Sequence, residues 1–347
     1  MHKVARLLLK WYRSNRILYP WRFTKDPYRV WLSEVLLQQT RIPVVLQYYE
    51  KILHQFPSLQ ALASARDSDF LSAWSGLGYY RRAHNMLRCA RELVSRHNGR
   101  FPLDLQTLQS LPGIGPYTAG AIRNICFDLL TPTADGNISR VLARITNNRH
   151  RMSTHAFRTE IARSFLEWGQ DAPPGEYLQS LMELGEQICL PKPECPRCPM
   201  QKLCLAYKKR SVLKIPQRPV KKEAEDCHWY FLVLRRKNSY YFVRNGQRAF
   251  LKDAWLFPDL LVTKRLSGTR LRTEYGRTWK IDLPNFVHGH TLRHSVTFRR
   301  IHAHVLRATE FRIRNGTGKW LTRNELMAHH TSSITKKILK LFAPFSA

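Results

Sequence analysis

The chain has 347 residues, 44% of them hydrophobic and 11% aromatic, which is the composition of a folded protein of two ordinary domains and excludes a disordered or collagen-like chain. No apolar run approaches the roughly 18 residues that span a bilayer, so we expect no membrane segment. The 57 Lys and Arg residues outnumber the 25 Asp and Glu residues, and the formal net charge is +32. Because self-repulsion makes this excess unfavourable, it indicates a polyanionic partner, with nucleic acid as the first choice.

The first 25 residues are basic and contain no acidic residue, a pattern shared with organelle transit peptides. Leu7, Leu8, Trp11 and Tyr12 form a helical stripe that continues directly into a motif at Trp21, so we interpret this segment as part of the fold. The apolar stretch at 7–9 is too short for a secretory signal. We therefore expect no secretion signal and a cytoplasmic, nucleoid-associated protein if the source is bacterial.

Helical periodicity dominates residues 1–206, where apolar residues recur every three or four positions. We predict an all-α domain over 1–206, a linker with Pro216 and Pro219 over 207–226, and an α+β domain over 227–347. In the last domain we expect strands at 229–234, 240–244, 297–306 and 310–314, turns at 245–246 and 315–316, and helices near residue 324 and at 331–342. The net charges are +11 for residues 1–206 and +21 for the other 141 residues, so both parts should be drawn to a phosphate backbone.

The segment 26–40, DPYRVWLSEVLLQQT, places an acid on an apolar helix face. Asp26 is a suitable N-cap and Pro27 a suitable first residue of a helix, so Glu34 falls in the third turn among apolar neighbours. Burial there would disfavour the charged carboxylate and raise its pKa, as a general acid at neutral pH requires. The alternative is a partly buried glutamate whose charge is satisfied by Arg22 or Arg29.

The segment 111–122, LPGIGPYTAGAI, has the residues of a hairpin between two helices. Gly113 and Gly115 would let backbone N–H groups approach an anion, and a helix that opens at Pro116 adds the positive end of its dipole. A helix-hairpin-helix of this kind grips a DNA phosphate without reading the sequence. A plain connection between two helices is the alternative.

A second candidate acid, Asp135, stands in ADGNISRVLARI, where a helix is predicted to begin near residue 136. Asp135 is suited to cap that helix, and capping alone would explain it. Capping is also compatible with catalysis, because a carboxylate fixed at a helix start stays ionised.

Four cysteines follow the spacing Cys189-x5-Cys195-x2-Cys198-x5-Cys204. Such close thiolates in a reducing compartment bind a metal, which would be zinc or an iron-sulfur cubane. Zinc ribbons usually bring two separated C-x2-C pairs, whereas this run has one, which favours the cluster.

These pieces, in this order, resemble the helix-hairpin-helix glycosylase superfamily and, within it, the adenine DNA glycosylases of the MutY family. The resemblance covers residues 18–206 and rests on PWR, DPYRVWLSEVLLQQT, GLGYYRRAHN, LPGIGPYTAGAI and DGNISRVLAR. It implies a base excision repair enzyme that removes adenine paired with 8-oxoguanine or guanine in double-stranded DNA and acts as a monomer. Relatives that also cut the backbone carry a lysine nucleophile in the hairpin, where this chain has Tyr117, so the resemblance implies no lyase activity.

The resemblance also implies roles for single residues. Glu34 would protonate adenine N7, Asp135 would stabilise the cationic sugar, and Tyr117 and Asn137 would hold the carboxylates and the water. The adenine pocket would comprise Trp21, Arg22, Leu37 and Gln179. The DNA contacts would come from Gln39 and Tyr79, which enter the base stack, and from the hairpin residues Gly113, Gly115 and Thr118. A core aromatic at a helix start is the alternative for Tyr79.

The resemblance implies one [4Fe-4S] cluster on the four cysteines, although the family usually has six residues between the first two and this chain has five. It further implies that residues 227–347 form a MutT-like (Nudix-type) domain, through WYFLVLRRKNSYYFVR and KDAWLFP. Family members read 8-oxoguanine there with a Phe-Ser-His loop. Here the aligned residues are Val296, Thr297 and Phe298, and His294, His302 or Thr297 would be the substitute reader. A phosphohydrolase is not expected, because residues 252–285 contain Glu274 as their only glutamate.

Two other hypotheses stay open at the level of sequence. A related helix-hairpin-helix glycosylase that removes a damaged or mismatched pyrimidine would share the scaffold. A non-catalytic, basic DNA-binding protein on the same fold is the second, and the presence of both Glu34 and Asp135 argues against it.

Overall fold

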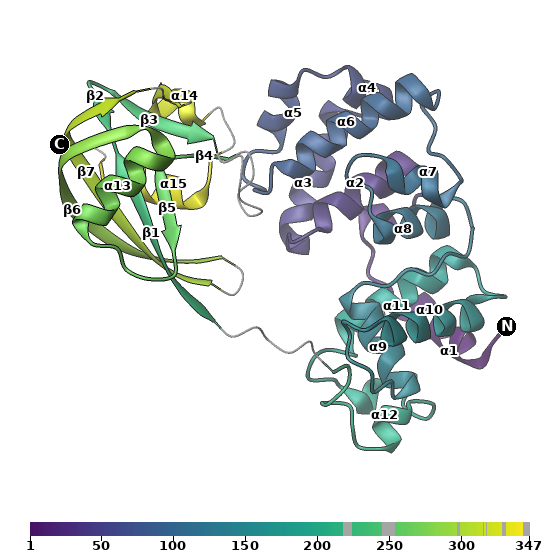
Figure 1. Cartoon of the computed structure of the whole chain (residues 1–347). Coiled ribbons are helices and arrows are strands. Elements are labelled where there is room, and N and C mark those ends of the chain that lie inside the picture. Colours follow the sequence, from purple (N-terminus) through teal and green to yellow (C-terminus); the bar gives the residue numbers. More distant parts are fainter. Residues whose placement is uncertain are drawn as a thin grey trace. The chain divides into compact units, whose positions relative to one another are not determined.

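The computed structural model describes residues 1–217, 224–244, 254–296, 299–314, 316, 318–327 and 331–342. The chain divides into two compact units, Met1–Val220 and Lys221–Ala347, and each is described by itself (Figure 1). Within the described ranges, no helix is both long enough and apolar enough to cross a membrane.

The first unit is helical, as the periodicity predicts. Its α-helices are α1 (Lys3–Asn15), α2 (Pro27–Leu37), α3 (Ile42–Gln55), α4 (Leu59–Ser64), α5 (Asp67–Ala73), α6 (Arg81–Arg96), α7 (Leu105–Ser110), α8 (Pro116–Cys126), α9 (Gly136–Thr146), α10 (His155–Gly169), α11 (Pro174–Gln187) and α12 (Leu205–Lys208). Two short 3₁₀ helices, η1 (Pro20–Arg22) and η2 (Cys195–Arg197), complete it. Asp26 caps α2 as expected, since its Oδ1 accepts a 2.8 Å hydrogen bond from Tyr28 N.

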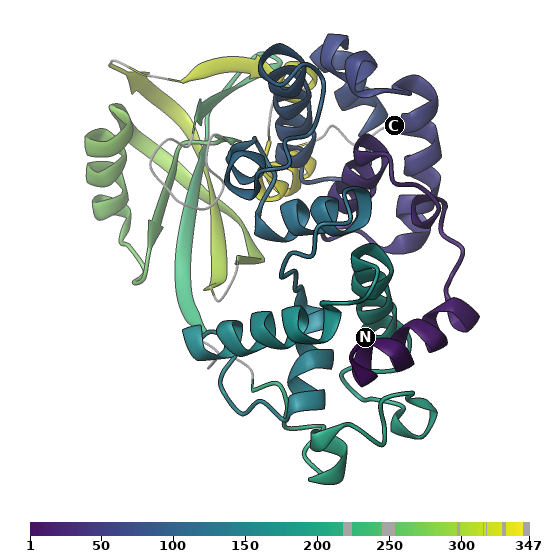
Figure 2. The same cartoon turned by 90° about the vertical axis from the view of Figure 1, so that its right-hand side faces the viewer.

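Two apolar cores hold this unit together, and Figures 1 and 2 show the two groups of helices that enclose them. One lies among α2 to α8 and contains Trp31, Phe70 and Trp74, all almost fully buried. The other lies among α1 and α9 to α11 and contains Phe165 and Tyr177. Helices α2 and α8 contribute side chains to both cores, and α8 contacts both α2 and α11. Glu34 on α2 and Tyr117 on α8 therefore lie on the two helices that contribute to both cores.

Residues 211–217, which fall in the expected linker, contact the helical unit. Ile215 is buried, the Ser211 hydroxyl donates a 2.7 Å hydrogen bond to Asn147 Oδ1, and Gln217 pairs with Arg151 through an isolated β-bridge. These contacts attach residues 211–217 to the helical unit. The two prolines and mixed charges mark a segment without periodicity, but absent periodicity does not distinguish a free linker from a chain packed on a surface.

The second unit is α+β. Its strands are β1 (Glu225–Val233), β2 (Arg235–Arg236), β3 (Ser239–Arg244), β4 (Trp255–Leu256), β5 (Asp259–Val262), β6 (Ile281–Val296), β7 (Arg299–Ile313) and β8 (Lys319–Thr322), and its helices are α13 (Gly268–Trp279), α14 (Arg323–Met327) and α15 (Ser333–Lys340). One sheet has the order β5-β1-β7-β6, with β1 and β7 parallel and the other pairs antiparallel. The other sheet joins β2, β3 and β4, with β8 on β3.

The sequence prediction for this unit was right in class and incomplete in detail. The strands expected at 229–234 and 240–244 are present, and α14 and α15 lie where helices were expected. The two strands expected at 297–306 and 310–314 form one long strand, β7. Helix α13 and strand β6 were missed, because β6 is rich in polar residues and exposed over much of its length, so its hydrophobic pattern is weak. The turns expected at 245–246 and 315–316 involve residues outside the described ranges.

Candidate active site

Glu34 is buried inside the helical unit. It lies on α2 with only 4% of its surface exposed, between Ser33 and Val35, which are also buried. The pKa of the Glu34 carboxyl is raised to about 7, mainly by burial, with the nearby charge of Asp135 adding to the shift and Arg22 and the Tyr117 hydroxyl opposing it. A carboxyl with this pKa is protonated in a large fraction of molecules at neutral pH, which is the state that a general acid needs.

The arginines named in the alternative explanation have other partners. Arg22 Nε lies 3.4 Å from Glu183 Oε1, and both side chains are almost completely buried. Arg29 Nε lies 3.7 Å from Asp26 Oδ2 at the surface. Arg22 still lowers the pKa of Glu34 through its charge, but desolvation exceeds that effect. Burial, and not pairing with either arginine, therefore dominates the environment of Glu34.

Asp135 caps α9, and its Oδ1 accepts a 2.7 Å hydrogen bond from Ile138 N. A helix-start position alone would lower the pKa of this carboxyl. Burial instead raises the pKa above its ordinary value, while the backbone N–H groups of Ile138 and Asn137 oppose the shift. The charges of Asp135 and Glu34 influence each other, so the structure brings the two predicted acids together.

Tyr117 and Asn137 are held beside these acids. Tyr117 is on α8, and burial raises the pKa of its hydroxyl well above the ordinary value, so the phenol stays protonated. Its hydroxyl donates to Met182 Sδ at 3.6 Å and lies close enough to Glu34 to lower the pKa of that carboxyl. Asn137 Oδ1 accepts a 2.9 Å hydrogen bond from Arg140 Nη2. Arg140 also donates to the carbonyl oxygens of Gly185 at 2.8 Å and Cys189 at 2.6 Å. The start of α9 is thereby attached to the cysteine-bearing segment, a link that sequence reasoning did not find.

The four residues predicted for the adenine pocket come from three elements. Trp21 and Arg22 lie on η1, Leu37 ends α2, and Gln179 lies on α11. Trp21 and Gln179 are buried, and Gln179 Oε1 accepts a 2.5 Å hydrogen bond from the Tyr12 hydroxyl. Three further polar atoms, Trp21 Nε1, Arg22 Nε and Glu183 Oε1, are buried without a hydrogen bond among the described residues.

Glu183 was not anticipated from the sequence. Its Oε2 accepts hydrogen bonds from Ile17 N at 3.1 Å and Gln187 Nε2 at 3.0 Å, which leaves Oε1 facing Arg22. Burial raises the pKa of this carboxyl, and Arg22 opposes the shift. Its position on α11, four residues after Gln179 and so on the same helix face, was the available signal.

The hairpin has the predicted form. Helices α7 and α8 flank residues 111–115, and α8 opens at Pro116 with Gly115 as N-cap. Gly113 has φ +82°, and a Cβ there would lie 2.8 Å from Asn85 Cβ, so glycine is required. A Cβ on Gly115 would meet nothing within 4 Å, which leaves this turn open to a ligand. Thr118 needs a correction, because its side chain is buried at 3% exposure and only its backbone N–H is a candidate for phosphate contact.

Gln39 and Tyr79 both occupy tight turns with left-handed backbone conformations, φ +58° and φ +47°. Such values are unusual for residues other than glycine and often mark functional positions. Tyr79 is 62% exposed, so it is not the core aromatic that was its alternative explanation. Gln39 is also exposed.

The four cysteines line a single cavity together with Arg144. Arg144 is buried and extends Nη1 to within 3.4 Å of Cys189 Sγ, while its carbonyl accepts from Cys204 Sγ at 3.3 Å. In the described part of the chain, no group of three or more His, Cys, Asp or Glu side chains is arranged to hold a metal ion. The donor set is nevertheless all thiol, which fits an iron-sulfur cluster or zinc and does not fit a hard cation.

The predicted damage-reading loop is only partly described. Thr297 and Phe298 lie outside the described residues, as does the side chain of Val296. His294 lies on β6 and is half-buried, and burial together with Lys337 lowers its pKa. Its imidazole is therefore neutral at neutral pH.

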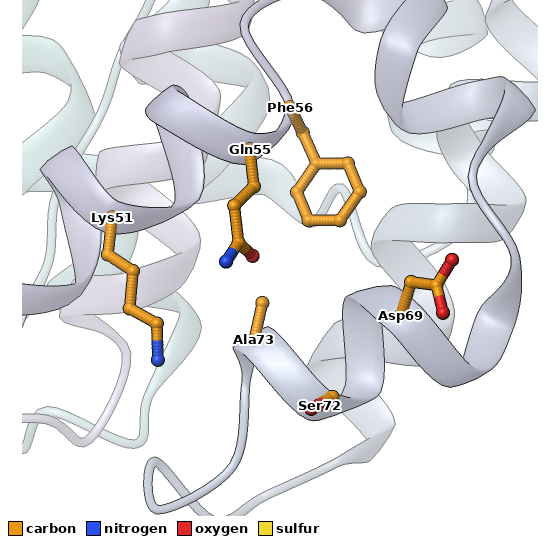
Figure 3. Close-up of a pocket in the computed structure, with 6 residues that line it drawn as sticks. All are labelled: Lys51, Gln55, Phe56, Asp69, Ser72 and Ala73. Atoms are coloured by element: carbon orange, nitrogen blue, oxygen red, sulfur yellow. The ribbon is translucent and has the colours of Figure 1, made fainter.

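A pocket away from these residues is shown in Figure 3. It lies between the end of α3 and α5 and is lined by Lys51, Gln55, Phe56, Asp69, Ser72 and Ala73. The Asp69 carboxylate at its edge accepts a 2.9 Å hydrogen bond from Arg66 Nε. None of the predicted site residues lines it, so we do not assign the chemistry to this pocket.

Comparison with known proteins identifies the family. Residues 32–166 match the family described as HhH-GPD superfamily base excision DNA repair protein. The adenine DNA glycosylase of Buchnera aphidicola subsp. Schizaphis graminum is 32% identical over 261 residues, which cover 74% of this chain and 74% of that protein. This chain belongs to the adenine DNA glycosylase family.

A second relative and a solved structure support the same family and fold for this adenine DNA glycosylase. The adenine DNA glycosylase of Mus musculus is 38% identical over 234 residues, covering 63% of this chain and 45% of that protein. A solved structure of a thermostable thymine-DNA glycosylase has a TM-score of 0.53 at 27% identity, covering 59% of this chain and 95% of that one. These findings confirm the family resemblance, the glycosylase fold of the helical unit and the enzyme class, a hydrolase acting on N-glycosyl bonds in base excision repair.

Proposed function

We propose that this adenine DNA glycosylase removes adenine paired with 8-oxoguanine or guanine in double-stranded DNA, with Glu34 as its general acid. The observation that carries the proposal is the burial of Glu34 beside Tyr117 and Asp135, with a pKa of about 7. A surface glutamate would be ionised at this pH and would have no proton to give.

Proton transfer from Glu34 to adenine N7 makes the base a neutral leaving group. As the bond from N9 to C1′ of the sugar breaks, the bonding electrons go to the base and positive charge develops on the deoxyribose. Asp135, fixed by backbone N–H groups at the start of α9, stabilises that charge. A water molecule then adds to C1′ and loses its proton to a carboxylate, which leaves an abasic site.

The supporting residues keep this geometry. The Tyr117 hydroxyl lies beside Glu34 and can donate to its carboxylate once the proton has been transferred. Arg140 holds Asn137 through its side-chain oxygen, so that the Asn137 amide N–H groups are available to the water or to the carboxylates. Tyr117 occupies the position of the lysine nucleophile in bifunctional relatives. A phenol cannot form the Schiff base that strand cleavage requires, so the enzyme is monofunctional.

Access to the adenine requires it to leave the duplex. The N–H groups of the hairpin at Gly113 and Gly115 and the start of α8 contact a phosphate, while Gln39 and Tyr79 enter the stack and replace the stacking partners of the adenine. Trp21, Arg22, Leu37 and Gln179 then surround the base. The buried Nε1 of Trp21, which has no hydrogen-bond partner among the described residues, supports this assignment, because a polar base would satisfy such a group.

A [4Fe-4S] cluster on Cys189, Cys195, Cys198 and Cys204 completes the proposal for the helical unit. Their shared cavity, the purely thiol donor set and the single C-x2-C pair support it. When bound, the cluster stabilises the loop, so that exposed Lys192 and Lys202 meet the DNA backbone. Iron analysis and visible absorbance of anaerobically purified protein test this, and zinc without iron would contradict it.

For the second unit we propose a MutT-like (Nudix-type) domain without hydrolase activity. Its α+β architecture and its net charge support a role in binding DNA. His294 on β6, with Thr297 and Phe298 nearby in the sequence, is the candidate reader of 8-oxoguanine. Replacing His294 with alanine should reduce the preference for 8-oxoguanine over guanine if it reads the base.

The function is tested by single-turnover base release from duplexes that differ only at the target pair. Adenine should be released opposite 8-oxoguanine and guanine and not from an A:T pair. Release of thymine opposite guanine would assign the enzyme to a pyrimidine-specific relative. Binding to all duplexes without any base release would indicate a non-catalytic protein.

A further inference from the structure

Arg82, the second residue of α6, makes contacts that no role proposed above requires. Its Nη1 donates to the carbonyl oxygens of Val35 at 2.8 Å, Leu36 at 3.1 Å and Gln38. These carbonyls lie at the C-terminal end of α2, where the last carbonyls of a helix have no partner within the helix. Helix α2, which carries Glu34, has two long backbone bonds of its own at this end, from Gln38 N to the Val35 carbonyl at 3.3 Å and from Thr40 N to the Leu37 carbonyl at 3.5 Å. Arg82 therefore adds to the capping of α2.

The same guanidinium contacts a second turn. Its Nη2 donates to Thr40 Oγ1 at 3.2 Å and to the Leu77 carbonyl at 3.4 Å. Its central carbon lies 5.2 Å from the ring centre of Trp74 and 5.6 Å from that of Tyr79. One side chain thus joins the turn at 38–40 to the turn at 77–79, which are about forty residues apart in sequence.

Each of these turns carries a strained residue. Gln39 and Tyr79 have left-handed backbone conformations, which persist in residues other than glycine only where the surroundings enforce them. Arg82 bonds to the carbonyl that precedes Gln39, bonds to the hydroxyl that follows it, and lies against the ring of Tyr79. Arg82 therefore contributes contacts to both conformations, next to local bonds such as the one from Trp74 Nε1 to the Gly78 carbonyl at 3.0 Å.

The start of α6 also reaches the hairpin. Gln38, Arg82, Asn85 and Gly113 line one small cavity, and Asn85 lies against Gly113 closely enough to exclude a Cβ there. The turns at 38–40 and 77–79 and the hairpin at 111–115 carry the proposed DNA contacts of this unit. All three contact the start of α6.

We propose that Arg82 is a positioning residue that sets Gln39 and Tyr79 as a pair, so that both enter the duplex together and hold the adenine out of the stack. This rests on the proposed function. Lysine would not substitute, because its single ammonium group lacks the planar fork that bonds several carbonyls and stacks on an aromatic ring. Arg82 acts on base flipping and not on the chemical step.

The test compares Arg82→Lys with a matched control, Arg91→Lys. Arg91 lies on the same helix and also bonds to carbonyl oxygens, those of Ala63 at 3.2 Å and Ala65 at 2.9 Å, and to Asp67 at 2.6 Å. Adenine release is measured under single-turnover conditions on two duplexes with the A:8-oxoguanine pair, one with matched flanking pairs and one with mismatched flanking pairs. The fluorescence of 2-aminopurine beside the target reports unstacking.

On the duplex with matched flanking pairs, Arg82→Lys should slow adenine release by about tenfold or more and reduce the unstacking signal. On the duplex with mismatched flanking pairs, which opens more easily, its release rate should recover to within about threefold of wild type. Arg91→Lys should stay within about twofold of wild type on both. Thr40→Val, which removes one acceptor of Arg82, should show the same pattern more weakly and serves if Arg82→Lys does not fold.

Equal losses on the two duplexes, or no loss with either variant, would overturn the proposal. Wild-type protein that releases no adenine from either duplex would instead refute the proposed function. The two failures are therefore distinguishable.

Discussion

The candidate active site of the helical unit and the antiparallel strands β6 and β7 of the second unit differ in where their charged side chains lie. In the active site the charged groups are few and buried, and each is held by named partners, as Arg22 is by Glu183 and Asp135 by the start of α9. On strands β6 and β7, the side chains of Arg293, Arg307 and Arg312 are exposed. Burial shifts protonation and fixes geometry, whereas exposed charge adds attraction that salt screens. The two regions should therefore fail differently when they are altered.

The largest effect is expected from Glu34→Gln, which removes the transferable proton and keeps the shape. Base release should fall by about 10² to 10⁴-fold, while duplex binding changes little, because the phosphate contacts are untouched. Single-turnover release and equilibrium binding are measured on the same preparation. Glu176→Gln is the control, since it removes only an exposed pair with Arg13 at 2.9 Å. Activity retained within about tenfold would remove Glu34 from this role.

Asp135→Asn should follow, with a loss of about 10² to 10³-fold in base release, because the neutral amide no longer stabilises the cationic sugar. Asparagine caps a helix about as well as aspartate, so the melting temperature should hardly move. Asp104→Asn, which alters the N-cap of α7 where Asp104 accepts a 2.8 Å hydrogen bond from Thr107 N, is the matched control and should leave activity unchanged. A loss of stability without a specific loss of rate would reduce Asp135 to a cap.

The raised pKa of Glu34 also predicts a pH dependence. Activity should fall as pH rises above about 7, by about tenfold per pH unit once the acid form is the minor one. The folded state binds this proton more tightly than the unfolded chain, so Glu34 loses its stabilising contribution as pH rises from about 4.5 through about 7. Glu34→Gln should consequently be more stable than wild type at pH 8, by on the order of 3 kcal/mol, and equal to it below about pH 4.5. Thermal melts at the two pH values measure this. If the variant and the wild type were equally stable at both, Glu34 would be in contact with water and not buried.

The smallest effect per residue is expected from substitutions on strands β6 and β7, and it concerns DNA binding. Changing Arg293 and Arg312 to glutamine should flatten the slope of log K against log salt by about 0.9 for each phosphate that the side chains no longer neutralise, with no change in the rate of bound enzyme. Arg314→Gln is the control, because Arg314 Nη2 is already paired with Asp282 at 2.8 Å. If the double variant changed the rate on saturated DNA and left the salt slope unchanged, the contrast between the two regions would be wrong.

Much of the helical unit followed from sequence, because its cues are local. Asp26 with Pro27, the two glycines before Pro116, and Asp135 before Gly136 all mark helix starts within a few residues of the chain. The second unit was predicted less well. Strand pairing joins residues far apart, as β1 joins β7, and a polar strand such as β6 has little hydrophobic pattern to reveal it.

For the site, residue types and motif resemblance were sufficient to name Glu34, Asp135, Tyr117 and the four cysteines as candidates. Tertiary structure decided how these groups behave. The burial that raises the pKa of Glu34, the upward shift of Asp135 against its helix-start position and the inaccessibility of Thr118 all depend on packing between α2, α8, α9 and α11. Glu183 and Arg82 were identified only in three dimensions, since desolvation and hydrogen-bond partners are set by neighbours far away in sequence.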